Sequence, residues 1–184
     1  MTKGPPFDPR VVANFLIDVA WDFEISITHL SLQKTLYFLH GRYLKEFSEP
    51  LIQGYFEAWK HGPVHPQIWS TFKSSGSAQI KHHAYGLDLL TGASRKLPAI
   101  EDKKLKLFIT TRGSEFLSIP APRLVGLSHA KGGPWDRVTK LSGGQREYGA
   151  RISDELILEC FHRHMIPIRE IEDLGDDLYE QPPT

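Results

Sequence analysis

Apolar side chains recur in the first quarter of the chain with the spacing of amphipathic helices. The first pattern starts at Asp8-Pro9, a pair that suits a helix start, and continues to about Phe23. After a short break a second pattern begins, whose apolar stripe comprises Leu32, Leu36, Leu39, Tyr43, Leu44 and Phe47. The alternative caps for its first turn are Ser26, Thr28 and Ser31. We therefore expect two helices that pack as an antiparallel or crossed pair.

The second helix is followed by a short apolar run and then by a dense Gly-Pro corner. The corner, residues 61–66, contains one glycine and two prolines, which interrupt both helices and strand ladders. We expect it to end the preceding element and to join it rigidly to a short helix over residues 64–72, because Ile68, Trp69 and Phe72 have helical spacing.

The middle of the chain has weaker patterns. Residues 78–100 combine scattered apolar side chains with glycines and a proline, so we expect irregular structure that includes short strands. Residues 103–111 alternate charged and apolar side chains, which predicts a strand. Together with the segment 113–117, this strand resembles the strand, turn and helix of a winged-helix wing. Such a weak hairpin would have to pack on the helices, since an isolated hairpin is marginally stable.

Two more helices are predicted in the last third of the chain. Pro120 and Pro122 open a helix that extends to about Ala130, and residues 131–135 form the loop that breaks it. Residues 141–149 are polar and rich in glycine, so we expect a mobile loop there. Ser153 caps a last helix, which Pro167 ends. The predicted fold class is mainly α (α+β): a single compact helical domain over residues 8–167 with a small antiparallel β hairpin.

Composition favours one ordinary globular domain. The chain has 184 residues, 40% of them hydrophobic and 24% charged, which is enough for one sizeable core and short for two. Basic and acidic residues number 22 each, so the global basic excess of a phosphate-binding protein is missing. Residues 168–184 form an acidic tail, which we expect to be disordered or to dock on the mildly basic body.

The sequence favours the cytoplasm as the compartment. Cys160 is the single cysteine, which excludes an intramolecular disulfide and suits a reducing environment. No stretch approaches the roughly 20 apolar residues of a membrane span. The first ten residues contain no apolar core of a secretory signal.

No catalytic or metal-binding constellation stands out. His61 and His65 are four residues apart, yet the prolines around them prevent the helical geometry of a zinc site. Cys160 lies on an apolar helical stripe, which is typical of an inert thiol. A carboxylate pair such as Glu57 and Glu115 stays open, although nothing singles these two residues out. We therefore expect no enzyme activity, no cofactor and no metal.

The Gly-Pro corner and the helix before it have the composition of a protein-binding hot spot, with large apolar area, a fixed backbone and a cation. Trp59 and Trp69 fit either a hot spot or a core, and Gln33, Lys34 and Arg42 are expected on the polar side of the helix, where they reach a partner or are simply solvated. The candidate partner-binding residues are Gln33, Lys34, Tyr37, Trp59, Lys60, His61, Gly62, Pro63, Val64 and Trp69.

The same stretch resembles the SocA-like, or Panacea, domain of antitoxins and phage-associated proteins. The resemblance rests on LQKTLYFLHGRYL from residue 32 and FEAWKHGPVHPQIWSTF from residue 56. A Gly-Pro-Trp at residues 133–135 and an Ile-Ser-x-Glu at residues 152–155 match in the right order. The resemblance covers roughly residues 11–165. Thr35 is one departure, because the family more often has an apolar residue at this position.

This resemblance implies an antitoxin, a domain that neutralises a toxin encoded beside it by forming a direct protein complex. It also implies a proteolytic adaptor, which delivers the bound toxin to a AAA+ protease. Neither role requires catalysis by this chain. The expected partners are therefore a cognate protein toxin and a AAA+ protease, and no membrane.

The alternative is a DNA-binding transcriptional regulator. The wing-like pattern of residues 103–117 and the mildly basic body favour it. Against it, no predicted helix carries the run of Arg, Lys, Asn and Gln residues that suits the major groove, so a nucleic-acid partner is not expected.

Overall fold

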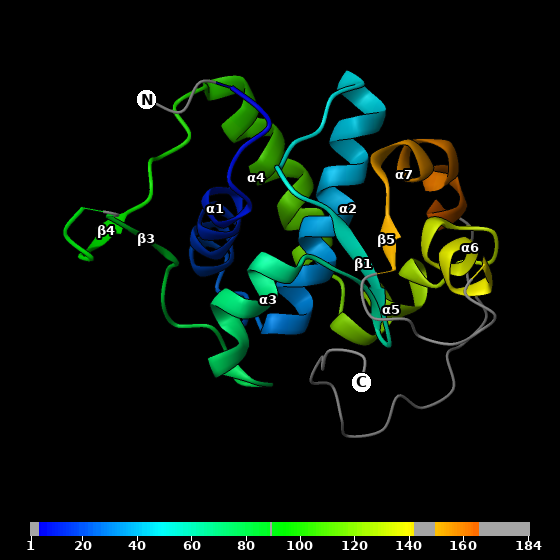
Figure 1. Cartoon of the computed structure of the whole chain (residues 1–184), viewed down its shortest axis with the longest axis horizontal. Coiled ribbons are helices and arrows are strands. Elements are labelled where there is room, and N and C mark those ends of the chain that lie inside the picture. Colours follow the sequence, from blue (N-terminus) through cyan, green and yellow to red (C-terminus); the bar gives the residue numbers. More distant parts are fainter. Residues whose placement is uncertain (1–3, 89, 142–149, 166–184) are drawn as a thin grey trace.

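The structure is a computed structural model that describes residues 4–88, 90–141 and 150–165 (Figure 1). It is mainly helical with two small antiparallel sheets, which confirms the predicted fold class. In chain order the helices are α1 (Pro9–Asp22), α2 (His29–Phe47), α3 (Pro66–Phe72), α4 (Lys103–Leu117), α5 (Ala121–Ser128), α6 (Pro134–Leu141) and α7 (Asp154–Cys160). The 3-10 helices are η1 (Lys73–Ser75) and η2 (Phe161–Met165). The strands are β1 (Phe56–Trp59), β2 (Gly62–Val64), β3 (Tyr85–Leu87), β4 (Ser94–Lys96) and β5 (Arg151–Ile152).

The first two helices begin where the sequence predicts. The Asp8 carboxylate accepts a hydrogen bond of 2.9 Å from the backbone N–H of Arg10. At the start of α2, Thr28 and Ser31 form a capping box, in which each side chain accepts from the backbone N–H of the other. Of the three candidate caps, Thr28 is therefore the one used.

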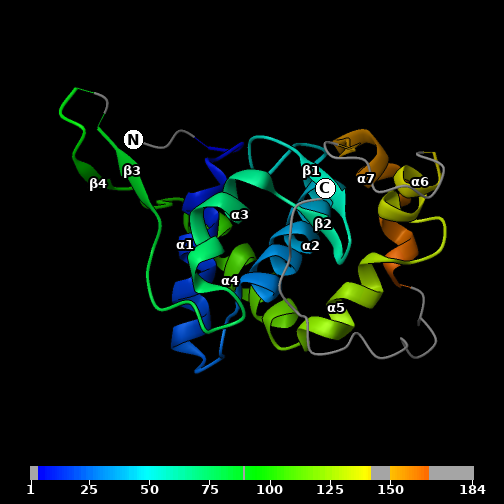
Figure 2. The same cartoon turned by 60° about the horizontal axis from the view of Figure 1, so that its bottom comes forward.

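Helix α2 runs through the centre of the molecule, as both views show (Figures 1 and 2). It packs against α1, α3, α4, α5 and α7, so side chains on nearly all of its sides are buried. Leu32, Leu36, Tyr37 and Leu39 are each 0% exposed. An amphipathic helix with one buried face was expected, and the structure instead places a helix covered on most sides.

The Gly-Pro corner is the return strand of a hairpin. Strand β2 pairs antiparallel with β1, with Ala58 opposite Pro63 and Trp59 opposite Gly62. Strand β5 pairs with the other side of β1, so the order is β2-β1-β5. The expectation that the corner stops a strand ladder is wrong. Proline is tolerated because β2 lies at the edge of the sheet, where one side of the strand needs no partner.

The wing-like hairpin predicted over residues 103–117 is also wrong, since this segment is helix α4. Asp102 caps it by accepting from the backbone N–H groups of Lys104 and Leu105. Its buried positions recur at every fourth residue, which is helical spacing: Leu105, Ile109, Gly113 and Leu117. The alternation that suggested a strand depended on Leu107, whose side chain is 68% exposed.

The second sheet is a two-stranded hairpin that projects from the body beside α1 (Figures 1 and 2). We call strands β3 and β4 the β3–β4 arm. Tyr85 lies opposite Lys96, and Leu87 lies opposite Ser94. The arm confirms the expectation of short strands within residues 78–100.

The C-terminal part of the structure agrees only partly with the prediction from the sequence. Ser153 caps α7 by accepting from the N–H of Leu156, as predicted. Helix α6 was not predicted, because residues 131–135 were interpreted as a loop only. Most of the expected mobile loop (residues 142–149), the stop at Pro167 and the acidic tail (residues 168–184) lie outside the described residues.

Candidate partner-binding site

The sequence-predicted residues around the Gly-Pro corner are mostly buried. Lys60 is exposed and Trp69 is half-buried. The other eight are buried: Gln33, Lys34, Tyr37, Trp59, His61, Gly62, Pro63 and Val64. The expectation that Gln33 and Lys34 face solvent on a polar side of α2 is wrong, since both are 0% exposed. Their role in partner binding stays a prediction.

These polar side chains are buried because the β1–β2 hairpin lies on their side of α2. The Gln33 amide bonds both backbone groups of His65: its Oε1 accepts from the N–H at 2.9 Å, and its Nε2 donates to the carbonyl at 3.3 Å. The Lys34 ammonium donates to the carbonyl of Pro63 at 3.0 Å. Two successive residues of α2 thus fasten the chain at Pro63 in β2 and at His65 just after it.

Gly62 is required by this close packing. Its φ of +100° is one that side chains rarely adopt, and a Cβ there would collide with the hydroxyl of Ser128. Ser128 itself is fixed on α5, where its hydroxyl donates to the carbonyl of Val125 at 2.7 Å. Helix α5 therefore closes over the hairpin at the turn.

Trp59 belongs to the core. It is 3% exposed, and its Nε1 donates to the Glu57 carboxylate at 2.8 Å. Trp135 from α6 donates its Nε1 to the carbonyl of Trp59, and the ring of His129 stacks on Trp135 at 3.8 Å. The Gly-Pro-Trp motif thus holds α6 against the hairpin. Trp69 lies 5.5 Å from Trp59, with the Lys73 ammonium over its ring.

Tyr37 and His164 form a buried polar pair about one turn further along α2 than Lys34. The Nδ1 of His164 lies 2.9 Å from the carbonyl of Leu127 and must donate to it, so its Nε2 accepts from the Tyr37 hydroxyl at 3.0 Å. Burial lowers the pKa of His164 to about 4. Burial also raises the pKa of Tyr37. Both groups are therefore neutral near pH 7 and serve packing.

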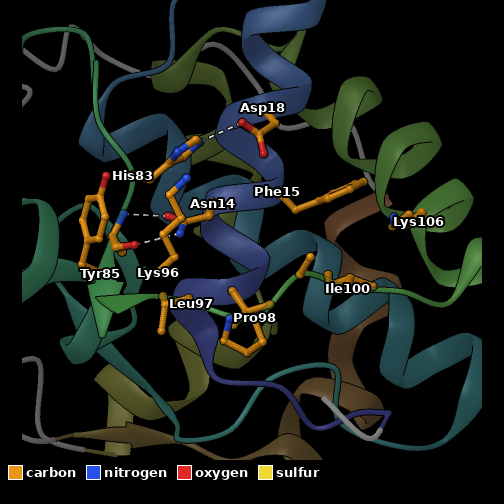
Figure 3. A pocket seen from close by; sticks show the side chains of 13 residues that line it. Asn14, Phe15, Asp18, His83, Tyr85, Lys96, Leu97, Pro98, Ile100 and Lys106 are labelled. Carbon is orange, nitrogen blue, oxygen red and sulfur yellow. Dashed lines mark hydrogen bonds and ion pairs between the residues drawn. The ribbon is translucent and has the colours of Figure 1, made fainter. Parts of the chain in front are cut away.

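A cleft of about 350 Å³ lies between α1, the β3–β4 arm and the start of α4, and we call it the arm cleft (Figure 3). Its root is preformed by bonds to α1. The Asn14 amide donates to the carbonyl of Ala84 at 2.9 Å and accepts from its N–H at 2.7 Å. The Asp18 carboxylate pairs with His83 at 2.7 Å, and Arg10 donates to the carbonyl of Tyr85.

The arm cleft combines apolar walls with basic side chains. The apolar lining comprises Val11, Phe15, Ala84, Leu97, Pro98, Ala99 and Ile100. Lys96 and Lys106 also line it, and within the described residues the ammonium group of neither makes a hydrogen bond or an ion pair. Figure 3 shows these two lysines on opposite sides of the cleft. Asp18 is already paired with His83, so the cleft favours a negatively charged ligand.

Large apolar side chains are exposed beside the arm cleft. Trp21 is 38% exposed, Tyr85 is 51% exposed and Leu87 is 58% exposed. The ring of Trp21 lies 4.9 Å from that of His83, and Tyr85 and Leu87 alternate with buried Gly86 on one face of β3. Tyr85 and Leu87 thus form an exposed apolar pair, and exposed aromatic and aliphatic side chains that adjoin one another are typical of a protein-binding surface.

A second cavity, of about 380 Å³, lies between α2, α4, α5 and η2. Its walls are Phe38, Phe116, Ile119, Leu127, Phe161 and His164. Arg42, Arg112 and Glu115 also line it. Arg112 and Glu115 pair with each other at 2.9 Å. Arg42, the other arginine that lines this cavity, has no ion pair with any of the described residues.

The described residues offer no sign of a metal centre or a reactive thiol. Within residues 4–88, 90–141 and 150–165, no three His, Cys, Asp or Glu side chains are grouped so as to hold a metal ion. Cys160 is 1% exposed, and burial raises the pKa of its thiol. None of the helices in that part of the chain has the length and apolar character of a membrane span.

Comparison with known proteins decides the family. The model of the family described as "Antitoxin SocA-like, Panacea domain" matches residues 32–136, which include most of α2, both hairpins and α4. The chain belongs to the SocA-like Panacea family. It is 38% identical over 185 residues to a protein named Antitoxin SocA from Caulobacter vibrioides (strain NA1000 / CB15N). That alignment covers 100% of this chain and 98% of the relative. No solved structure matches.

The family assignment gives a context to the contacts described above. The Panacea match begins at the residues that fasten β2 to α2 and ends beyond the Gly-Pro-Trp motif that holds α6 on the hairpin. Trp135 and Ser128 were missed as packing partners of the β1–β2 hairpin, because Trp135 lies 76 residues from Trp59 and Ser128 lies 66 residues from Gly62 along the chain. The arm cleft was also missed. Its local signal in the sequence was weak: two lysines, Lys96 and Lys106, close to the short apolar run of residues 97–100.

Proposed function

We propose that this protein is an antitoxin, which neutralises a toxin encoded nearby by binding it directly. The observation that carries the proposal is the match to Antitoxin SocA over the whole chain. Because the alignment covers the body, the arm and the tail alike, the proposal extends to the entire protein and not to one domain of it. We place its action in the cytoplasm and assign it a non-enzymatic role, as befits a family of antitoxins.

The surface of the protein supports a direct complex. Tyr85 and Leu87 are exposed on one face of β3 at the arm cleft, where the backbone of the preceding residue, Ala84, is held by hydrogen bonds to α1. A preformed apolar surface binds with a smaller loss of conformational entropy than a mobile one. A complex of standard size would bury roughly 800 Å² on each partner.

The proposal includes a second step, delivery of the bound toxin to a AAA+ protease. This step predicts that the toxin is short-lived in cells that hold the antitoxin and long-lived in cells without it. Pulse-chase labelling of the toxin in the two strains tests it separately from neutralisation, because a stable complex without degradation would retain the first step and remove the second.

DNA binding is the less supported function. The segment that resembled a DNA-binding wing forms helix α4, so the structure does not contain the wing on which this function was based. A titration of the purified protein with a duplex of its own promoter, at two salt concentrations, would revive it only if binding were tight and weakened with salt.

Co-expression tests the proposal. The neighbouring reading frame is induced alone, with this chain, and with a Trp59→Ala variant, which we expect to be destabilised. We expect growth arrest from the neighbour alone, normal growth with the intact chain and arrest with the variant. A harmless neighbour, or arrest that the intact chain does not relieve, would contradict the antitoxin role.

A further inference from the structure

We infer that the arm cleft binds an extended, acidic segment of the partner protein, with an apolar side chain of that segment seated between α1 and β4. The inference rests on the proposed function, because it identifies the surface and the partner chemistry of the same complex. Nothing in the family assignment places the contact there.

The first support is the shape and stiffness of the cleft. A volume of about 350 Å³ accommodates one large side chain, and the walls next to it are apolar. Asn14 holds both backbone groups of Ala84, and Asp18 holds His83, so the arm is fixed to α1 at two neighbouring residues. The cleft is therefore present before any partner arrives.

The second support is charge. Lys96 from the arm and Lys106 from α4 line the cleft without an ion pair in the described part of the chain, whereas Asp18 is already paired. Two unpaired ammonium groups beside an apolar cleft attract carboxylates that flank an apolar side chain. The carboxylates of an acidic segment would form ion pairs with both lysines, whereas the positive charges of a basic segment would repel them.

The third support is the open edge of β4. The N–H of Asp88 donates to the carbonyl of Ala93 at 2.8 Å, so by the alternation of an antiparallel ladder Ser94 and Lys96 direct their backbone groups away from β3. Within the described residues those groups have no other strand beside them. An extended segment can add to this edge through main-chain hydrogen bonds, which favours it over a helix.

Protein is favoured over nucleic acid as the occupant. The whole chain has zero formal net charge, and the cleft walls are mainly aliphatic. Nucleic-acid sites instead combine a wider basic surface with aromatic side chains on which bases stack. Phe15 and Tyr85 are the Phe, Tyr or Trp side chains in the lining, and Trp21 beside the cleft lies against the ring of His83 at 4.9 Å.

The test is binding of the purified product of the neighbouring reading frame, measured by titration calorimetry. The Lys96→Glu/Lys106→Glu variant should lower the affinity at least about tenfold and reduce its dependence on salt. Tyr85→Ser/Leu87→Ser should lower it about thirtyfold, as expected for hot-spot side chains. The matched control is Lys45→Glu, an exposed charge reversal on α2 outside the lining of the cleft, which should bind like the wild type. Lys60→Glu on the β1–β2 hairpin tests the Gly-Pro corner separately.

The outcomes separate the two proposals. If the wild type neither binds nor neutralises the neighbour, the proposed function fails. If the wild type binds, and both cleft variants melt and bind as it does, the inference about the cleft is wrong. Loss of binding in Lys60→Glu alone would place the contact at the Gly-Pro corner instead.

Photo-crosslinking maps the contact directly and does not depend on how well the variants above fold. A photo-crosslinking amino acid in place of Leu87 should form a covalent adduct with the partner, and mass spectrometry should map it to an acidic segment. Adducts from position 60 and none from position 87 would overturn the inference. If a labelled promoter duplex bound and competed with the partner at the cleft, the occupant of the cleft would be a nucleic acid and not a protein segment.

Discussion

The ammonium of Lys34 donates a hydrogen bond of 3.0 Å to the carbonyl of Pro63, and the lysine side chain is 0% exposed. A proline carbonyl in an edge strand thus receives a charged donor from the central helix. Burial of a charge is costly unless it is hydrogen-bonded, so the position is sensitive to both partners.

Replacement of this ammonium should destabilise the protein. Lys34→Met keeps the length of the side chain but leaves the carbonyl of Pro63 without this donor, and we expect a loss of about 1–3 kcal/mol in the free energy of unfolding. Urea denaturation measures it. The control is Lys45→Met on the exposed side of the same helix, which should change stability by less than about 0.5 kcal/mol. A Lys34→Met variant as stable as the wild type would show that desolvation cancels the bond.

Trp59 should act through the fold and not through an exposed contact. Trp59→Ala removes a buried ring and its bond to Glu57, and we expect a loss of about 3–5 kcal/mol, seen as a large drop in the melting temperature. Trp21→Ala on the surface should cost less than about 1 kcal/mol. An unchanged melt of Trp59→Ala, together with lost partner binding, would instead restore the hot-spot interpretation.

Gly62 should be more sensitive to substitution than a glycine of similar backbone angle in open space. Gly62→Ala combines a positive φ with a collision against Ser128, whereas Gly92→Ala has a φ of +68° and no neighbour within 4 Å. We expect about 1 kcal/mol for the backbone alone at Gly92 and clearly more at Gly62. Thermal melts of both variants compare the two, and equal losses would mean that α5 yields to the new methyl group.

Acid should destabilise the protein through His164. Its pKa is about 4 in the folded protein and near 6.5 when unfolded, so between these values the unfolded state binds more protons. Stability should therefore fall as the pH drops from about 6.5 toward 4, by up to roughly 1.4 kcal/mol for each pH unit. Burial also lowers the pKa of His65, which adds in the same direction.

The His164→Leu variant isolates the contribution of this histidine. It cannot titrate and keeps an apolar side chain beside Tyr37, so its stability should depend less on pH between 6.5 and 4 than that of the wild type. Urea midpoints at four or five pH values measure the two slopes. Parallel slopes would show that His164 does not contribute to the acid sensitivity.

The sequence predicts the elements that local signals encode. Asp8, Thr28 and Ser153 are caps whose side chains bond to the next backbone N–H groups, and each starts a helix as expected. Helix α4 also had a local signal, namely Asp102 followed by apolar residues at every fourth position. The alternation around Leu107 obscured it, because a period of two and a period of four agree at Leu105 and Ile109.

The candidate site was harder to predict because burial is decided by distant segments. Gln33 and Lys34 are polar residues on a helix, and only the hairpin about 30 residues further along the chain buries them. The arm cleft depends on bonds from Asn14 and Asp18 to residues 65–70 positions away. The tertiary arrangement that creates such a surface leaves little trace in local spacing.

Direct binding of the toxin is the step by which we propose that this chain neutralises it. The most direct test mixes the two purified proteins and measures their elution by size-exclusion chromatography with light scattering. We predict one peak that contains both chains in a fixed ratio, with a mass equal to their complex. Separate elution of two folded proteins, from a pair that relieves growth arrest in cells, would contradict direct binding.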